Sequence, residues 1–125
     1  MTKAILEIDN ASARALFLDR HALATRSTHV LSEAELHALI HKLGFVQLDS
    51  VNAVERAHHM ILFSRGAGYQ RELLHTLHHD QRSLFEHWTH DASLIPMEFY
   101  PHWHHRFTAA KARLKHPNWS SRIGD

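Results

Sequence analysis

Three things are missing from this sequence: cysteine, a long hydrophobic run and a strong net charge. Without cysteine the chain can form no disulfide and offers no thiolate to a metal, which fits a reducing cytosol. No apolar run approaches the roughly 20 residues that a membrane-spanning helix needs. The N-terminus carries Lys3, Glu7 and Asp9 where a secretory signal would be hydrophobic. We therefore expect a cytoplasmic protein that has no membrane partner.

Histidine is the residue in excess. The formal net charge of +1 does not by itself indicate nucleic acid. The chain has 15 histidines, however, and imidazoles gain charge near an ordinary pKa of about 6.5. The protein should therefore become markedly more positive just below neutral pH. Its 125 residues suffice for one domain with a hydrophobic core.

The first part of the chain predicts a helix and then a loop. Apolar residues keep to one helical face over residues 10–23, with Asn10 or Ser12 as the capping residue. Residues 24–31 show no period and are rich in serine and threonine, which indicates a loop. We expect residues 1–31 to form an N-terminal segment of their own.

A second helix is marked at both ends. Ser32 is followed three residues later by Glu35, the pattern of a capping box that satisfies two unpaired backbone donors at a helix start. Apolar residues then recur at helical spacing: Leu36, Leu39, Ile40 and Leu43. Gly44 can adopt the left-handed conformation that commonly ends a helix.

A short strand over residues 45–49 should follow this glycine. Side chains alternate along a strand, so Gln47 and Asp49 project to one face while Val46 and Leu48 project to the other. The strand can then be buried and still present an amide and a carboxylate side by side.

The rest of the chain continues with short elements. In order, these are a helix over 52–63, a break at 66–68, a helix over 69–79, a strand over 84–88 and a strand over 92–95. Pro96 should close the last strand because it cannot extend the ladder. One long helix with its aromatic residues facing inward is expected over 97–115, followed by an aperiodic tail to residue 125.

From residue 32 onward the order helix, strand, helix, helix, strand, strand is that of a winged-helix domain. We expect a mostly α fold with a small β component, in which residues 32–96 form the winged-helix unit. Residues 69–79 would be its recognition helix and residues 84–95 its wing. The N-terminal helix would flank it on one side, and the long helix and tail of residues 97–125 on the other, the tail leading to further domains.

Several motifs in the middle of the chain carry a specific resemblance. They are Gln47-Leu48-Asp49-Ser50-Val51-Asn52, Val54-Glu55-Arg56-Ala57-His58-His59, Leu62-Phe63-Ser64-Arg65-Gly66 and Tyr69-Gln70. Leu84-Phe85-Glu86-His87-Trp88-Thr89-His90 and Ala92-Ser93-Leu94-Ile95-Pro96-Met97 follow at colinear spacing. Across residues 32–107 the chain resembles the YcaQ/AlkZ family of bacterial DNA glycosylases.

The resemblance implies a function and a site. Members of that family build several winged-helix units around a DNA-binding channel and excise alkylated and crosslinked bases. Their catalytic signature is Gln, a hydrophobic residue, then Gln or Asp, and it stands here as Gln47-Leu48-Asp49, the YcaQ variant. The resemblance implies a monofunctional, monomeric glycosylase without cofactor that acts on alkylated or crosslinked purines of double-stranded DNA in a bacterial nucleoid. It also implies interstrand crosslink repair, and further winged-helix units beyond residue 125 without which this region is inactive.

The chemistry suits a carboxylate beside an amide. An N7-alkylated purine is cationic and leaves readily, so the protein must supply an activated water and stabilise positive charge on the sugar. The carboxylate of Asp49 would deprotonate the water while Gln47 orients it. The structural alternative is that Asp49 caps the following helix.

Five residues are candidates for contacts with DNA. Arg56 and Arg65 would bind phosphates, the alternative being ordinary solvated charges. Tyr69, Gln70 and Arg71 stand at the start of the expected recognition helix, where phosphate contacts are common. If Gln47 and Asp49 were only structural, the chain would be a non-catalytic winged-helix module that binds DNA or regulates transcription.

Paired histidines and clustered aromatics each allow a second interpretation. The pairs 58–59, 78–79 and 104–105 would point apart on a helix, and no metal-binding spacing appears, so a metal-binding domain is the weakest alternative. Large aromatics could stack on bases, but at helical spacing they are more typical of a core: Trp88, Tyr100, Trp103 and Phe107. We expect no metal and an aromatic core.

Overall fold

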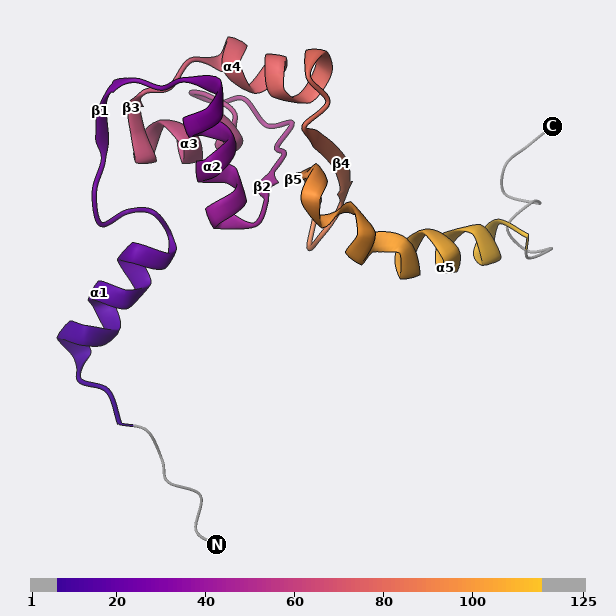
Figure 1. Ribbon diagram of the computed structural model, residues 1–125, viewed down its shortest axis with the longest axis horizontal. Coiled ribbons are helices and arrows are strands. Elements are labelled where there is room, and N and C mark those ends of the chain that lie inside the picture. The colour runs from indigo at the N-terminus through magenta and orange to yellow at the C-terminus, as the bar shows by residue number, and fades with distance from the viewer. Residues whose placement is uncertain (1–6, 116–125) are drawn as a thin grey trace, which may run out of the picture.

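The computed structural model describes residues 7–115 of the chain (Figure 1). Its helices are α1 (Asn10–Arg20), α2 (Glu33–Leu43), α3 (Ala57–Arg65), α4 (Arg71–His75) and α5 (His104–Leu114), with a π-helical segment (Thr76–Asp80) and a 3-10 helix (Met97–Trp103). Its strands are β1 (Ser27–Val30), β2 (Val46–Gln47), β3 (Gly66–Gly68), β4 (Leu84–Trp88) and β5 (Ala92–Pro96). The fold is therefore mainly helical with a small β component. The expected tail beyond residue 115 lies outside the described residues.

Two small sheets connect the helices. β2, β5 and β4 form an antiparallel sheet in that order, with Val46 opposite Leu94 and Leu84 opposite Pro96. The predicted hairpin of β4 and β5 is confirmed, including Pro96 as the last residue of its second strand. The second sheet pairs β1 with β3 in parallel. β5, central in the first sheet, is the most deeply buried strand.

The hydrophobic core lies where α2, α3 and α4 meet the three-stranded sheet. Its fully or nearly fully buried side chains are Leu36, Ile40, Val46, Leu62, Leu74, Leu77, Leu84 and Leu94. Burying one such side chain contributes about 1.5–3 kcal/mol, so these eight are the main source of stability. The strand predicted over 45–49 is shorter in the structure, because only Val46 and Gln47 form β2 and residues 48 and 49 already belong to the following loop. Val46 is buried in the core and Leu48 packs against it, as the predicted alternation requires.

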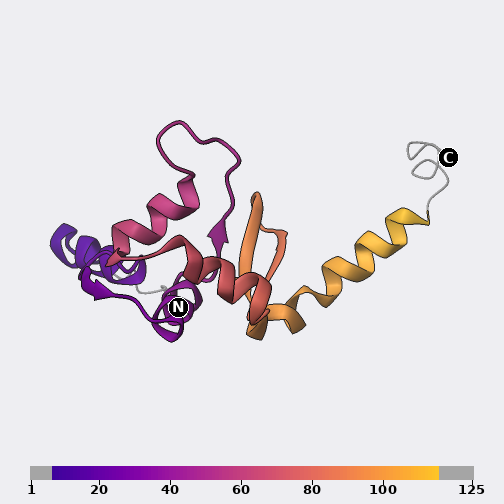
Figure 2. The same ribbon diagram turned by 90° about the horizontal axis from the view of Figure 1, so that it is seen from above.

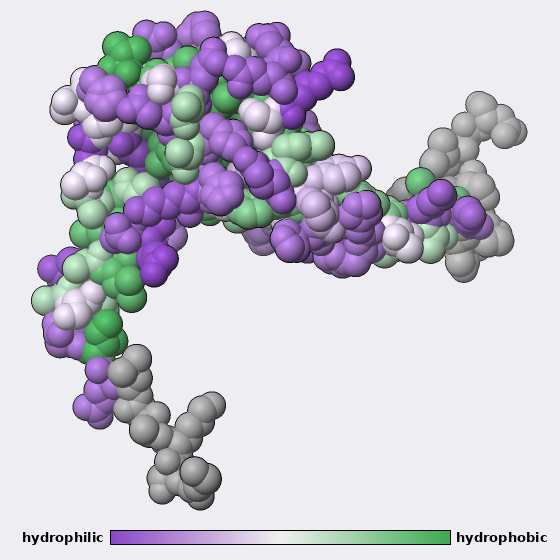
Figure 3. Space-filling view, in the orientation of Figure 1, coloured by the Kyte–Doolittle hydropathy of each residue, from purple (hydrophilic) through white to green (hydrophobic). Residues whose placement is uncertain are grey.

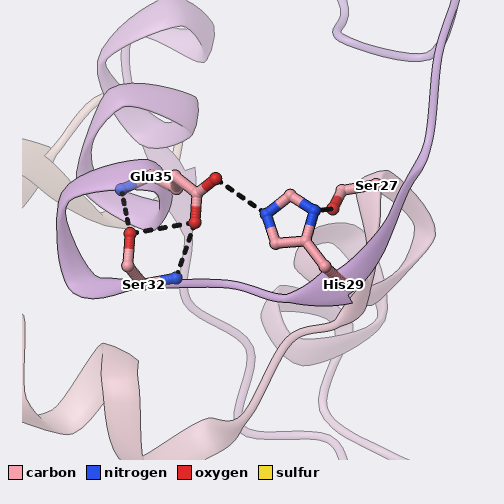
Figure 4. Close-up of polar contacts among 4 residues, drawn as sticks. All are labelled: Ser27, His29, Ser32 and Glu35. Atoms are coloured by element: carbon pink, nitrogen blue, oxygen red, sulfur yellow. Dashed lines mark hydrogen bonds and ion pairs between the residues drawn. The ribbon is translucent and has the colours of Figure 1, made fainter.

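The capping box predicted for α2 is confirmed (Figure 4). Ser32 Oγ accepts the amide of Glu35 at 3.3 Å, and Glu35 Oε2 accepts the amide of Ser32 at 2.8 Å. The other carboxylate oxygen lies 2.7 Å from Nε2 of His29 in β1. The bonds from Ser32 and His29 lower the pKa of Glu35 to about 2. At its other end the helix stops at Gly44, whose φ of +87° also confirms the prediction.

Residues 27–30 form strand β1, so the loop predicted for this region is wrong in part. Their partner is β3, almost 40 residues further along the chain, and no local sequence pattern predicts such a pairing. The close approach depends on Gly68, since a Cβ there would overlap the carbonyl oxygen of His29. β1 thus exists because a distant glycine accommodates it.

The helix predicted over 52–63 begins instead at Ala57. Residues 48–56 form an irregular loop that projects from the body between β2 and α3 (Figure 2). Val51 and Val54 match a helical face by spacing, but their side chains are 67% and 92% exposed and contribute nothing to the core. Without burial of that face, the chain has no reason to be helical here.

Three other helix boundaries differ from expectation. Asp9, rather than Asn10 or Ser12, caps α1 by accepting the amides of residues 11 and 12. The helix predicted over 69–79 starts at Arg71 and ends in the π-helical segment. The helix predicted over 97–115 is divided, because its first part is a 3-10 helix containing Pro101 and only its second part, α5, is α-helical.

The helices α1 and α5 extend away from the body as two arms (Figure 1). The apolar face expected of α1 exists, but Leu16 and Phe17 are half exposed, and this arm is among the apolar parts of the face in Figure 3. Within residues 7–115 no helix has the length and apolar character to cross a membrane.

The expected aromatic core is only partly correct. Trp103 and Phe107 are half-buried beside β4, where the rings of Phe85 and Tyr100 lie 5.3 Å apart. Trp88 is 58% exposed and belongs to no core, because it is the last residue of β4, beside the hairpin turn and beyond the buried part of the sheet.

Candidate active-site cleft

Gln47 and Asp49 line one cleft of about 430 Å³ at the end of β2. β2 positions them, since Gln47 lies opposite Ser93 of β5 and the amide of Leu48 donates to the Ala92 carbonyl at 2.8 Å. The remaining lining residues come from the loop, α3 and the β4–β5 hairpin: Leu48, Ser50, Arg56, His58, Glu86, Asp91 and Ala92. The amide and the carboxylate thus share a solvent-accessible hollow beside the sheet.

The carboxylate of Asp49 is fixed by a turn. Its Oδ1 accepts the amide of Val51 at 2.8 Å. The alternative that Asp49 caps the following helix is wrong, because α3 begins at Ala57 and its N-cap residue is Arg56. Within the described residues the other carboxylate oxygen, Oδ2, accepts no hydrogen bond, so it is free to bind a water in the cleft.

The backbone of Asp49 is held by a hydrogen bond to a histidine of α3. Its amide donates to Nδ1 of His58 at 3.3 Å, and His58 is only 5% exposed. Burial lowers the pKa of His58, and the nearby His59 and Arg56 lower it further against the opposing effect of Asp49. His58 is therefore neutral at pH 7. The sequence placed His58 on the helix predicted over 52–63 and raised it as a metal ligand, but not as a partner of Asp49. The signal available in the sequence was that His58 stands nine residues after Asp49, within the motifs that carry the family resemblance.

Carboxylates outnumber fixed cations around the cleft. Asp49 lies on the loop, Glu86 on β4 and Asp91 in the hairpin turn, and the only arginine that lines the same cleft is Arg56. With His58 neutral, these groups carry three negative charges and one positive charge. Such a cleft attracts a positively charged group and repels phosphate.

A second groove of about 490 Å³ adjoins the cleft and shares Leu48, Arg56 and His58 with it. Histidines of α3, α4 and the π-helical segment line this groove: His58, His59, His75, His78 and His79. Arg71 also lines it and forms an ion pair with Glu55. In the part of the chain that the structure describes, the guanidinium of Arg56 makes no ion pair. It is thus available to an anion at the junction of the two hollows.

The five predicted DNA-contact residues do not gather in one place. Arg56 and Arg71 line the histidine groove. Tyr69 is half-buried, with its hydroxyl 2.7 Å from Nδ1 of His59, and burial raises its pKa. Gln70 is exposed and precedes α4. Arg65 lies apart from the others, because its Nε donates to the His21 carbonyl at 2.8 Å and its Nη1 to the Ile61 carbonyl at 2.9 Å.

In two of the histidine pairs the rings contact each other at a tilted angle. Ring centroids are 4.2 Å apart for His58 and His59, and 4.3 Å apart for His78 and His79. Among residues 7–115 no group of three or more His, Asp or Glu side chains has the arrangement that a metal ion requires.

Comparison with known families gives the class of protein. A family model described as DNA glycosylase AlkZ-like matches residues 40–123, which is more than half of the chain. The chain therefore belongs to the AlkZ-like DNA glycosylase family, and the resemblance carried by the Gln47-Leu48-Asp49 region is confirmed. The match includes both hollows described above. The protein is thus a glycosylase whose substrate is DNA. No solved structure matches the chain significantly.

Proposed function

We propose that this chain is the N-terminal catalytic region of a DNA repair glycosylase that hydrolyses the N-glycosidic bond of alkylated or crosslinked purines. One observation carries the proposal: Gln47 and Asp49 lie together in an open, negatively charged cleft of an AlkZ-like chain. A cytoplasmic, monomeric enzyme that needs no cofactor is part of the same proposal.

Asp49 acts as the general base. Water attacks C1′ of the sugar, its proton passes to the free Oδ2 of Asp49, and the electrons of the C1′–N9 bond return to the cationic purine, which leaves neutral. Gln47 binds the same water through its amide and fixes its direction of approach. Positive charge develops on the sugar during this step, and the carboxylates of Glu86 and Asp91 stabilise it.

The negative cleft also favours a particular substrate. An N7-alkylated purine carries a positive charge that an undamaged purine lacks, so the three carboxylates select for damage by charge. Both a monoadduct and a crosslink through N7 have this charge. An alkylated base therefore enters more favourably than an ordinary one.

We assign the DNA-binding arrangement to a winged helix over residues 32–96. The order α2, β2, α3, α4, β4, β5 and the β2-β5-β4 sheet support this assignment. α4 then serves as the recognition helix and the β4–β5 hairpin as the wing. Arg56 and Arg71 bind phosphates beside the histidine groove, with Tyr69 and Gln70 at the start of α4. Residues 1–31 and 97–125 flank this unit.

The test is base release from N7-methylguanine DNA by the protein as its gene encodes it, under single-turnover conditions. Asp49→Asn keeps the acceptor for the Val51 amide but removes the base, so the rate should fall about 100-fold or more. Asp19→Asn makes the same change on α1, away from the cleft, and should leave the rate unchanged. A wild-type protein that shifts DNA mobility without releasing base would instead identify a non-catalytic binding module.

A further inference from the structure

Among the histidines of residues 7–115, only His58 is buried, and its hydrogen bond is made to the backbone of the proposed base. Nδ1 of its ring accepts the Asp49 amide at 3.3 Å. The ring is also held from the side. Its centroid lies 4.2 Å from that of the tilted His59 ring, and His59 Nδ1 is in turn 2.7 Å from the Tyr69 hydroxyl. The position of the imidazole is therefore set by its contacts within α3 and with Tyr69 as well as by its contact with the loop.

The direction of this hydrogen bond defines the state of the ring. Because the Asp49 amide is a donor, Nδ1 must carry its lone pair and the proton must be on Nε2. A doubly protonated ring would turn an N–H toward the amide N–H of Asp49. Two donors facing each other in a buried place repel, so the contact exists only with the neutral imidazole.

We propose that His58 is a positioning residue for base hydrolysis, whose neutral imidazole anchors the Asp49 backbone and thereby sets the carboxylate toward the cleft. The proposal rests on the proposed role of Asp49 as the general base. The loop of residues 48–56 is held at its start by the Leu48 amide and near its end by the Glu55–Arg71 ion pair and the helix cap at Arg56. Between these ends, the His58 contact joins the Asp49 backbone to α3. Protonation of His58 releases that restraint.

The surroundings of His58 decide when it is protonated. The charged and titratable groups that line the two hollows with it are Asp49, Arg56, His59, Arg71, Glu72, His75, His78, His79, Glu86 and Asp91. Burial dominates and, with His59 and Arg56, lowers the pKa of His58 below its ordinary 6.5, while Asp49 acts in the opposite sense. Base release at saturating enzyme should therefore be constant above pH 6.5 and fall as the pH drops through the lowered pKa.

Two isosteric amides test the position of the acceptor. The side-chain oxygen of Asn occupies the place of Nδ1, whereas that of Gln reaches the place of Nε2. His58→Asn should keep the rate at pH 7.5 within about threefold of wild type and should lose the part of the acidic decline that is centred on the pKa of His58, since an amide does not titrate. His58→Gln should lose about tenfold or more at pH 7.5, because the acceptor is misplaced.

His59→Asn is the matched control on the same helix, because it removes a neighbouring imidazole that does not contact Asp49. It should retain the acidic decline. If His58→Gln keeps the wild-type rate, or if His58→Asn keeps the part of the acidic decline centred on the pKa of His58, the proposal is overturned. Loss of activity in Asp49→Asn together with either of these results would leave the proposed function standing and remove only the role of His58.

A measurement without catalysis covers the case in which the variants do not fold. In wild-type protein the NMR amide shift of Asp49 should titrate with the same pKa as the His58 ring. The Asp49 amide proton should also exchange with solvent faster below that pKa. An Asp49 amide that is insensitive to the titration of His58 would overturn the proposal without any use of activity.

Discussion

Asp49 and Val51 form a turn in which Oδ1 of the aspartate accepts the valine amide at 2.8 Å. The turn takes the place of the helix start that the sequence suggested, and it leaves the second carboxylate oxygen facing solvent in the cleft. A capping role would have used the carboxylate to satisfy backbone donors of α3, which begins only at Ala57. The geometry is thus that of a carboxylate held by one oxygen and exposed by the other.

Gln47→Ala should lower base release about tenfold, less than Asp49→Asn, because Gln47 orients the water but accepts no proton. Folding should be unaffected, since within residues 7–115 the Gln47 side chain makes no hydrogen bond. Gln81→Ala is the matched control, because that amide binds Glu33 away from the cleft. Equal rate losses in the two variants, measured under single-turnover conditions, would contradict the orienting role.

Features with local signals could be predicted from the sequence. The capping box depends on residues three apart, the stop at Gly44 on one backbone angle, and the β4–β5 hairpin on two strands separated by a short turn. That Gln47 and Asp49 line one cleft also agrees with the alternation expected from the sequence, although only Gln47 lies in β2 and Asp49 is held by its contacts with Val51 and His58. These signals required no knowledge of distant partners.

The features that the sequence did not predict depend on tertiary contacts. β1 is a strand only because Gly68 lets β3 approach it, and Val51 and Val54 are exposed although their spacing matches a helical face. The role of His58 was missed for the same reason. The sequence alone does not show whether a histidine is a metal ligand, a surface charge or a hydrogen-bond acceptor, because this depends on its neighbours. The neighbour of His58 is a backbone amide nine residues away in the sequence.

We expect the histidine groove to make DNA binding sensitive to pH. Affinity should rise as the pH falls from about 7.5 to 6, because neutral imidazoles become cations beside phosphates. Burial lowers the pKa of His58, His59 and His78, so the rise should be steepest at the acid end of this window. Fluorescence anisotropy at constant ionic strength measures it.

Two paired variants locate the histidines responsible. Replacing His78 and His79 by Gln should remove part of the rise in affinity, since both line the groove. Replacing His104 and His105 by Gln on α5 should leave it intact, because neither residue lines the groove. A flat affinity for wild type would show that the groove does not contact DNA. At saturating enzyme the rate of base release no longer depends on affinity, so the acidic decline expected for His58 can be measured separately from this effect.

The carboxylate of Glu35 should make stability depend on pH in the acid range. Its folded-state pKa of about 2 lies below the ordinary 4.5, chiefly because of the bond from the Ser32 amide. The stabilisation is therefore fully present above pH 4.5 and is lost as the pH falls toward 2. Glu35→Gln keeps the shape of the capping box without the charge. The difference in urea unfolding free energy between wild type and this variant should shrink between pH 6 and pH 3.

Glu33→Gln is the control for that measurement, since it removes the same charge from the same helical turn without touching the box. Its difference from wild type should change less between the two pH values. An equal change in both variants would assign the effect to the charge of the helix N-terminus in general and not to the bonds from Ser32 and His29.

Gly44 and Gly68 offer two Gly→Ala changes that should destabilise the fold for different reasons. Gly44 has a φ of +87° with nothing within 4 Å of the added Cβ, so Gly44→Ala should cost only the backbone penalty, about 1–2 kcal/mol. At Gly68 the new Cβ would overlap the carbonyl oxygen of His29, and backbone must move. Gly68→Ala should therefore cost more in urea unfolding and should separate β1 from β3. Hydrogen exchange distinguishes the two, because the Leu31 amide donates to the Gly68 carbonyl at 3.3 Å and should lose protection only in Gly68→Ala. Equal protection of Leu31 in both variants would mean that β1 does not depend on the close approach at Gly68.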